Sequence, residues 1–236
     1  MADGIYVTMC GAAARGEQLD AVADNLANAQ TPGFKASRPA FEAFLPASGA
    51  TDKSYPAAVA TRVDLRPGAV TQTGNALDVV PEDGAFLSVL ASDGTKAYTR
   101  DGQLAVDSSR RLVQAGRPVL DRNGSTISVP PGSTPHLTSE GNVEAGGFTV
   151  GQLGLYQLSG AVDRIGQSLY VPGAQGSARP LADGRVRTGQ LELSNASPLD
   201  GMVQLITAQR NFDASMQALQ TYRSLDQHGS DLGRVR

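Results

Sequence analysis

The sequence predicts an α+β fold in which one long helix at each end of the chain flanks a central antiparallel β-domain. Small and apolar residues recur at helical spacing near both termini, and turn dipeptides recur between them. A proline-rich stretch separates the first helix from the first strands. We therefore expect an N-terminal helix in residues 1–35, an extended connector in 36–74, the β-domain in 75–189 and a C-terminal helix in 190–236.

Composition excludes several classes of function. The 236 residues are 40% hydrophobic but only 5% aromatic, so the core must be aliphatic. The net charge of −3 lacks the basic excess that nucleic-acid binding needs, and we expect no nucleic-acid partner. No stretch approaches the ~18 apolar residues of a membrane span. The N-terminus also lacks the basic and apolar regions of a signal peptide, so we expect no cleaved signal.

The N-terminal helix is predicted by residues that step by four and three, the a/d rhythm of a helix that packs against another helix. The residues of this stripe are Ile5, Met9, Ala12, Gly16, Leu19, Ala23 and Leu26. Residues off the stripe are also mostly small, which allows burial on two sides. A helix hairpin with an exposed alanine-rich back is the alternative. Cys10 has no second thiol to pair with, and we interpret it as a small, packed residue.

The C-terminal helix has a clear start signal. Ser197 suits the N-cap, Pro198 the first helical position, and Asp200 favours the helix N-terminus by its charge. The stripe that follows consists of Met202, Leu205, Gln209, Phe212, Met216, Leu219 and Arg223. Gln209 either sets the register of a coiled-coil-like pair or lies at the solvated edge of the stripe.

Between the helices, the chain first turns and then forms short strands. Pro32-Gly33 fits the centre of a type II turn, so the first helix should end near Ala29 or Gln30. Dipeptides such as Asp93-Gly94 and Asn123-Gly124 then separate strand-like runs of the β-domain.

Tyr98 and Arg100, in "YTRDG", are read as strand-end and turn residues that can also serve as β-domain contacts at an interface.

No catalytic constellation or cofactor motif is evident. The two histidines, His136 and His228, lack motif neighbours. "DRNGS" resembles the start of a calcium loop, but an Asn-Gly hairpin turn explains it better. The acidic group Asp78, Glu82 and Asp83 is interpreted as surface turn residues rather than a glycosidase-like carboxylate pair. We expect no catalytic, cofactor-binding or metal-binding residue.

Three segments resemble the flagellar basal-body rod and hook family of bacteria. They are "DNLANAQTPGFK", "DGAFLSVLASDGTKAYTRDGQLAVD" and "TGQLELSNASPLDGMVQLITAQRNFDASMQAL". Their order is that of the family, and together they reach nearly from end to end of the chain. The modest length and the start "GIYVTMCGAAA" look most like a proximal rod subunit, with a distal rod or hook-type axial subunit next.

The resemblance implies a non-enzymatic building block of the rod, the driveshaft that crosses the periplasm from motor to hook. Its terminal helices would form an inner tube, with copies of itself and neighbouring rod and hook-family proteins as partners. The flagellar type III apparatus would export the chain without a cleaved signal. A remote alternative from another class is a secreted β-rich glycan-binding module or enzyme with a helical stalk.

The predicted assembly interface combines the two stripes with the turn. Asn25 and Asn28 lie away from Leu26, where their amides could bond to neighbouring subunits, and Phe34 could anchor the exit of the chain, whereas Lys35 is expected to be replaceable. The predicted N-terminal residues are Ile5, Met9, Ala12, Leu19, Asn25, Leu26, Asn28, Pro32, Gly33 and Phe34. The predicted C-terminal residues are Met202, Leu205, Gln209, Phe212, Met216 and Leu219.

Overall fold

The computed structural model describes residues 2–44 and 55–233. It contains two long helices and a central region of antiparallel strands, as the sequence predicts. The chain divides into two compact units. Unit 1 comprises Met1–Ala27, Ser37–Arg62 and Ser197–Arg236, and unit 2 comprises Asn28–Ala36 and Val63–Ala196.

The elements follow one another in the order helix, strands, helix. The helices are α1 (Ala2–Ala27) and α2 (Pro198–Gly233). The strands of the first half are β1 (Ser37–Phe44), β2 (Tyr55–Val63), β3 (Val70–Gln72), β4 (Val79–Pro81), β5 (Phe86–Leu90), β6 (Lys96–Thr99), β7 (Leu104–Val106), β8 (Leu112–Gln114) and β9 (Arg117–Pro118). Those of the second half are β10 (His136–Leu137), β11 (Asn142–Ala145), β12 (Phe148–Gln152), β13 (Leu155–Ser159), β14 (Val162–Arg164), β15 (Leu169–Pro172), β16 (Ser177–Pro180), β17 (Val186–Thr188) and β18 (Gln190–Glu192).

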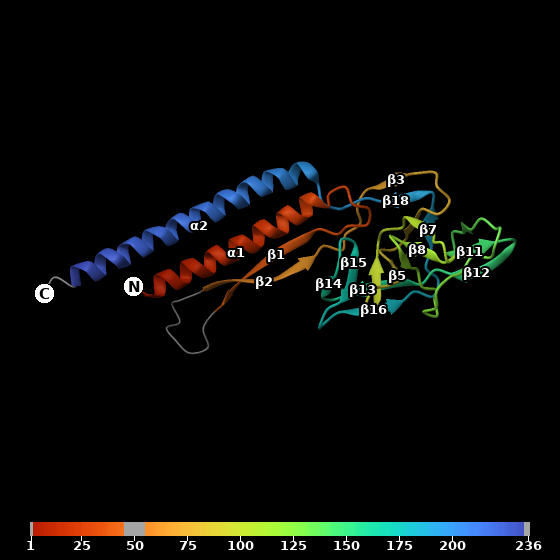
Figure 1. Cartoon of the computed structure of the whole chain (residues 1–236), viewed down its shortest axis with the longest axis horizontal. Coiled ribbons are helices and arrows are strands. Elements are labelled where there is room, and N and C mark those ends of the chain that lie inside the picture. Colours follow the sequence, from red (N-terminus) through yellow and green to blue (C-terminus); the bar gives the residue numbers. More distant parts are fainter. Residues whose placement is uncertain (1, 45–54, 234–236) are drawn as a thin grey trace. The chain divides into compact units, whose positions relative to one another are not determined.

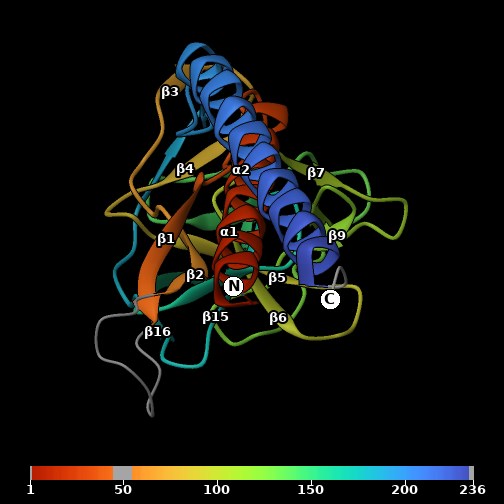
Figure 2. The ribbon, with the colours of Figure 1, turned by 90° about the vertical axis from the view of Figure 1, so that its left-hand side faces the viewer.

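Unit 1 is built around α1, which contacts α2 on one side and β1 on another. Figure 1 shows α1 between α2 and the β1–β2 pair, and Figure 2 shows the same elements from the side at which the termini lie. Ala12, Ala14, Ala21 and Val22 are buried, and their small side chains allow both neighbours to approach closely. In this chain α1 is therefore buried on two sides. Cys10 is exposed, which corrects its expected packing.

The helix boundaries follow the predicted signals. The backbone N–H of Asp200 donates to Ser197 Oγ at 3.3 Å, which confirms the N-cap, and α2 begins at Pro198. The first helix ends at Ala27, before the predicted end near Ala29 or Gln30, because the Asn28 carbonyl already accepts the turn hydrogen bond from the Thr31 N–H at 3.0 Å.

The predicted connector, 36–74, contains paired strands where it is described. β1 pairs with β2, and β3 pairs with β18. The prolines of this segment argued against strands, but a two-stranded sheet has a free edge on both strands, where a missing N–H is tolerated. Residues 45–54 of the predicted connector and 234–236 of the predicted C-terminal helix segment lie outside the described residues.

Unit 2 is the antiparallel β-region. A six-stranded sheet has the order β14-β15-β6-β5-β13-β16, and two three-stranded sheets have the orders β7-β8-β9 and β10-β11-β12. The pairs β17–β4 and β18–β3 bring the last strands back to the first ones of the unit. An aliphatic core fills its interior, including the fully buried Leu87, Val89, Leu112 and Val143. This core explains how a chain with few aromatic residues folds.

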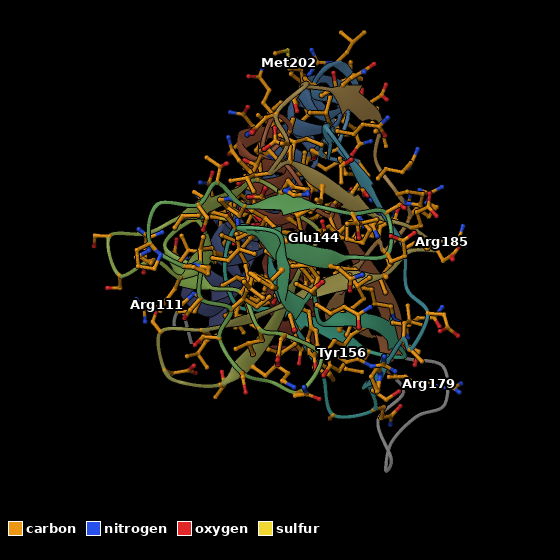
Figure 3. All side chains as sticks on the ribbon, turned by 90° about the vertical axis from the view of Figure 1, so that its right-hand side faces the viewer. Arg111, Glu144, Tyr156, Arg179, Arg185 and Met202 are labelled. Atoms are coloured by element: carbon orange, nitrogen blue, oxygen red, sulfur yellow. The ribbon has the colours of Figure 1, made fainter. Side chains whose placement is uncertain are left out.

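Turns in unit 2 occur at the predicted dipeptides Asp93-Gly94 and Asn123-Gly124. Positive φ values occur at Gly94 and Gly124, and also at Gly116, Gly132 and Gly141. In "DRNGS", Asp121 accepts hydrogen bonds from the backbone N–H groups of Asn123 and Ser125, as a hairpin turn requires. Arg111 follows the tight turn between β7 and β8 and is labelled in Figure 3; its guanidinium pairs with Asp107 at 2.8 Å.

Three residues expected at the surface are buried. Tyr98 lies in β6 against the ring of Tyr156, and Arg100 follows that strand into the interior, so neither forms an exposed contact surface. Asp78 is buried as well, and its backbone forms an isolated antiparallel bridge with Gln103. Turn residues beside short strands look exposed in a sequence, but the packing of several small sheets covers them. None of the described helices combines the length and apolarity needed to span a membrane.

Candidate assembly site

The contact between α1 and α2 depends on glycines. A Cβ at Gly16 would lie 3.7 Å from Cε2 of Phe212, and one at Gly201 would lie 3.3 Å from Cδ1 of Leu26. Gly201 therefore allows the Leu26 side chain to approach the backbone of α2 closely, whereas a methyl group at Gly16 would make an ordinary contact with Phe212. Ala208 and Leu219, also on this side of α2, are buried. The two helices thus form a pair inside one chain, with a narrow seam of small residues.

The structure places the predicted helix residues in three groups. Ala12 and Leu219 are buried, and the side chains of Met9, Met202 and Gln209 are exposed. The remainder are half-buried: Ile5, Leu19, Leu26, Leu205, Phe212 and Met216.

The predicted stripe therefore follows the contact only in part. The predicted stripe places Met202 and Gln209 in the helix contact, rather than their neighbours Gly201 and Ala208. Close helix approach selects the small neighbours instead, and it turns the larger side chains outward.

A second apolar face of α2 points away from this seam. Leu199, Met202, Val203 and Ile206 expose 74%, 54%, 60% and 54% of their surface, respectively. Their spacing puts them on one side of the first two turns of α2, opposite Gly201 and Ala208. Met202 is labelled in Figure 3. We call these four residues the α2 apolar face. The sequence signal for it was present, since all four are apolar, but a single a/d stripe accounts for only one of them.

The two asparagines of "DNLANAQTPGFK" have partners within the chain. The Asn25 side-chain amide donates to the Ser37 carbonyl at 2.8 Å and accepts from the Ser37 N–H at 2.7 Å. Asn28 is buried, and its Oδ1 accepts a hydrogen bond from Thr31 Oγ1 at 3.3 Å. This differs from the expected lateral bonds to other subunits. Both amides instead shape the end of α1 and the start of the next segment.

The turn after α1 is closely packed in unit 2. Gly33 has a φ of 67°, and a Cβ there would lie 2.1 Å from the backbone nitrogen of Asp101. Phe34 is fully buried and Arg164 lies over its ring at 5.0 Å, so Phe34 anchors this turn inside its own chain, whereas Pro32 is half-buried.

Lys35 lies in a buried ion cluster, which corrects the expectation that it is replaceable. Its Nζ is 2.5 Å from Oε1 of Glu192 and donates to the Arg66 carbonyl at 2.7 Å. Oε2 of the same carboxylate bonds to the Arg100 guanidinium. The Gly68 N–H donates to Oε1 at 3.0 Å. We call Lys35, Arg100 and Glu192 the ion cluster.

Burial and the neighbouring charges shift the pKa values of Lys35 and Glu192 in the ion cluster. Burial lowers the pKa of Lys35 against the opposing effect of Glu192. Burial also opposes ionisation of Glu192, but the charge of Arg100 and the hydrogen bond from Lys35 hold the pKa of Glu192 below its usual value. Two cations share one carboxylate, and the carbonyls of Pro81 and Ala85 accept hydrogen bonds from Arg100. This arrangement holds three segments of the chain together. Both carboxylate oxygens of Glu192 accept hydrogen bonds.

A second buried acid lies next to the turn. Asp101 accepts hydrogen bonds from the Gln103 N–H at 3.0 Å and from Gln114 Nε2 at 2.6 Å. Burial raises the pKa of Asp101, and the nearby charge of Asp78 raises it further. Asp78 in turn accepts a hydrogen bond from Asn75 Nδ2 at 2.9 Å. Both carboxylates thus serve local structure. Within the described ranges, no three His, Cys, Asp or Glu side chains are grouped as metal ligands.

An open hollow of about 320 Å³ lies on unit 2. Glu82, Arg185 and Arg187 line it, and Arg185 is labelled in Figure 3. Arg187 Nε lies 3.6 Å from Oε1 of Glu82, and both side chains are solvated. The Glu82–Arg187 pair of this hollow therefore lies in water, and the hollow lacks the desolvated ionisable group typical of an active site.

Three family profiles match successive parts of the chain. The "Flagella basal body rod protein" profile matches residues 5–35, which contain most of α1 and the turn. The "Flagellar hook protein FlgE/F/G D1 domain" profile matches 82–155, in unit 2. The "Flagellar basal body rod FlgEFG protein C-terminal" profile matches 187–232, which contains β18 and α2.

Several proteins are similar to the chain over nearly its full length. The flagellar basal-body rod protein FlgF of Mesorhizobium japonicum is 31% identical over 99% of both chains. FlgF of Salmonella typhimurium is 32% identical over 93% of both chains. The rod protein FlgG of Borreliella burgdorferi is 31% identical over 94% of this chain and 95% of its own. The order of the matched profiles, the paired terminal helices and this full-length similarity agree: the chain belongs to the flagellar basal-body rod protein family.

Proposed function

We propose that the chain is a non-enzymatic structural subunit of the flagellar rod, of the proximal, FlgF-like type. Family membership and the near full-length FlgF relatives support this function, and the FlgG relatives keep a distal rod subunit as the second candidate. Its partners would be other copies and neighbouring rod and hook-family proteins. The single observation that carries an assembly role is the α2 apolar face, which a lone subunit leaves in water.

The energetics favour covering this face. Full burial of a large aliphatic side chain contributes about 1.5–3 kcal/mol, and the four residues of the face are already partly covered. Covering what remains would contribute roughly 1 kcal/mol for each side chain. We propose that helices of neighbouring subunits cover it, so that α1 and α2 belong to an inner helical layer. Repeated head-to-tail contacts of this kind produce a helical assembly when the rotation does not close.

This assembly would suit a driveshaft. Torque transmission needs stiffness, which many interlocked helices supply together. We also propose that the rod carries the chain across the periplasm, and that the flagellar type III apparatus exports it without a cleaved signal. A glycan-binding or enzymatic role has less support, because Asp78 is buried and Glu82 is paired with Arg187 in solvent.

Substitution of Ile206 by Lys tests the proposed function. Ile206→Lys should leave the purified subunit folded, because the side chain is 54% exposed, but it should remove the subunit from isolated basal bodies and abolish swimming. Ile165→Lys is the matched control, since Ile165 is 49% exposed in unit 2. The measurements are thermal unfolding of the subunit, immunoblots of basal bodies and swimming of the complemented deletion strain. Normal incorporation of Ile206→Lys would contradict the proposal.

A further inference from the structure

Two segments of unit 2 adjoin the terminal helices: residues 28–36 follow α1 and residues 192–196 precede α2, and the two segments are hydrogen-bonded to each other. The Gly33 N–H donates to the Glu192 carbonyl at 2.8 Å, and the Asn195 N–H donates to the Phe34 carbonyl at 3.3 Å. The Ala36 N–H also donates to Asn195 Oδ1 at 2.6 Å. Residues 28–36 and 192–196 are called the first and second exit segments. Backbone bonds thus join two segments that lie far apart in the sequence.

The ion cluster lies where these segments meet. Lys35 comes from the first exit segment, Glu192 from the second, and Arg100 from the end of β6. Their side-chain exposures are 0%, 0% and 4%. Removal of Glu192 would leave two cations buried beside each other, which costs several kcal/mol in comparable buried sites. Neither exit segment is therefore stable in its place without the other.

The two partners are separated by 157 residues. Closing so long a loop costs conformational entropy, which the contacts of the completed junction must offset. Before residue 192 joins the fold, the buried positions of Lys35 and Arg100 lack the carboxylate that pairs with both. Partial folds that bury these two cations are therefore disfavoured.

We infer that the ion cluster is a latch: it joins the segment that follows α1 to the segment that precedes α2, and it closes only when Glu192 arrives. Lys35 and Glu192 are positioning residues for these exits. The relevance of the latch to rod assembly rests on the proposed function. The latch itself is a property of the single subunit and can be measured without assembly.

Hydrogen exchange of the full chain tests the latch. In Glu192→Gln, the amides of Gly33 and Asn195 should exchange about tenfold faster or more, because each is bonded to the opposite exit segment. The amides of the core residues Leu87 and Val89 should keep their protection. Glu82→Gln removes the same charge from a solvated pair and should change none of these amides. Unchanged exchange of Gly33 and Asn195 in Glu192→Gln would overturn the latch, as would equal loss of protection throughout unit 2.

A second variant keeps the test valid if Glu192→Gln does not fold. Lys35→Met removes one cation, fills a similar volume and leaves the neutral Arg100–Glu192 pair. Faster exchange of Gly33 and Asn195 together, by about threefold or more, is the expected result. Wild-type exchange at both amides in this variant would overturn the latch.

Refolding of the unmodified chain tests the order of closure. With pulsed hydrogen exchange, the amides of Gly33 and Asn195 should become protected in the same kinetic phase. Protection of Gly33 in an earlier phase than Asn195 would contradict the inference. These readouts come from the free subunit, so they stand apart from the basal-body assay. Normal assembly of Ile206→Lys would reject the proposed function alone, and unchanged exchange would reject the latch alone.

Discussion

At the scale of single residues, the turn after α1 depends on tight packing that a sequence pattern does not reveal. Pro32-Gly33 predicts a turn, but the contact of Gly33 with the backbone of Asp101 arises only when unit 2 is folded. Lys35 looks like an ordinary surface lysine in the sequence. The structure shows it fully buried, because Glu192, 157 residues later, supplies the opposite charge.

Gly33→Val is expected to destabilise unit 2 severely, by more than about 4 kcal/mol, because it combines backbone strain with a steric clash. Gly74→Val is the matched control. Gly74 has a similar φ of 73°, but a Cβ there meets nothing within 4 Å, so only strain of about 1–3 kcal/mol applies. Urea unfolding of both variants measures the difference. Equal losses of unfolding free energy in the two variants would show that the clash with the Asp101 backbone adds nothing to the backbone strain.

Asp101→Asn is expected to stabilise the protein at pH 7 by about 1 kcal/mol. Burial raises the pKa of Asp101, so its contribution to stability falls as the pH rises from 3.8 through the folded pKa. An asparagine does not ionise, and its side-chain oxygen can accept the hydrogen bond from the Gln103 N–H. The advantage over the wild type should therefore grow from pH 3.5 to pH 7 in urea unfolding.

The contribution of Asp93 to stability has the opposite pH dependence, which Asp93→Asn tests. Hydrogen bonds from the side chain and backbone of Thr95 lower the pKa of Asp93, so its ionised form is favoured in the folded state. Any stability it contributes is present above pH 3.8 and is lost as the pH falls through the folded pKa. Asp93→Asn should therefore not stabilise the protein at pH 7.

For Asp101→Asn, a stability advantage over the wild type that shrinks with rising pH would disprove the explanation from burial.

At the scale of elements, the helices were predictable and their contact faces were not. Ser197 and Pro198 mark the start of α2 by local chemistry that needs no tertiary context. The seam between α1 and α2 instead uses Gly201 and Ala208, while Met202 and Gln209 point outward. On a weakly polar helix, spacing alone does not show which of two adjacent residues faces the partner helix. That choice depends on how closely the partner helix approaches.

Leu219→Ala should lower the helix-pair stability by about 2 kcal/mol, since Leu219 is buried in the seam. Leu225→Ala, the matched control, should change it by less than about 0.5 kcal/mol, because Leu225 is 54% exposed. Thermal unfolding followed by circular dichroism at the helical band measures both. A larger effect at Leu225 would mean that the end of α2 is buried by another surface.

At the scale of the whole molecule, the two units draw on different stretches of the chain. Unit 1 takes both ends and the β1–β2 pair, whereas unit 2 takes most of the residues between them. The return of β17 and β18 to pair with β4 and β3 closes unit 2 at its two exits. This topology places the start and end of the β-region together, as the predicted path of helix, β-domain and helix requires.

Local sequence patterns suffice to predict the α+β class, the two terminal helices, the start of α2 and many turns of the β-region. These features depend on local preferences: capping, proline geometry, glycine conformation and periodicity. Tertiary structure alone decided the partners of Asn25, the seam of glycines, the ion cluster and the outward direction of the α2 apolar face. Those features depend on residues distant in sequence, whose desolvation and close packing exist only after the chain has folded.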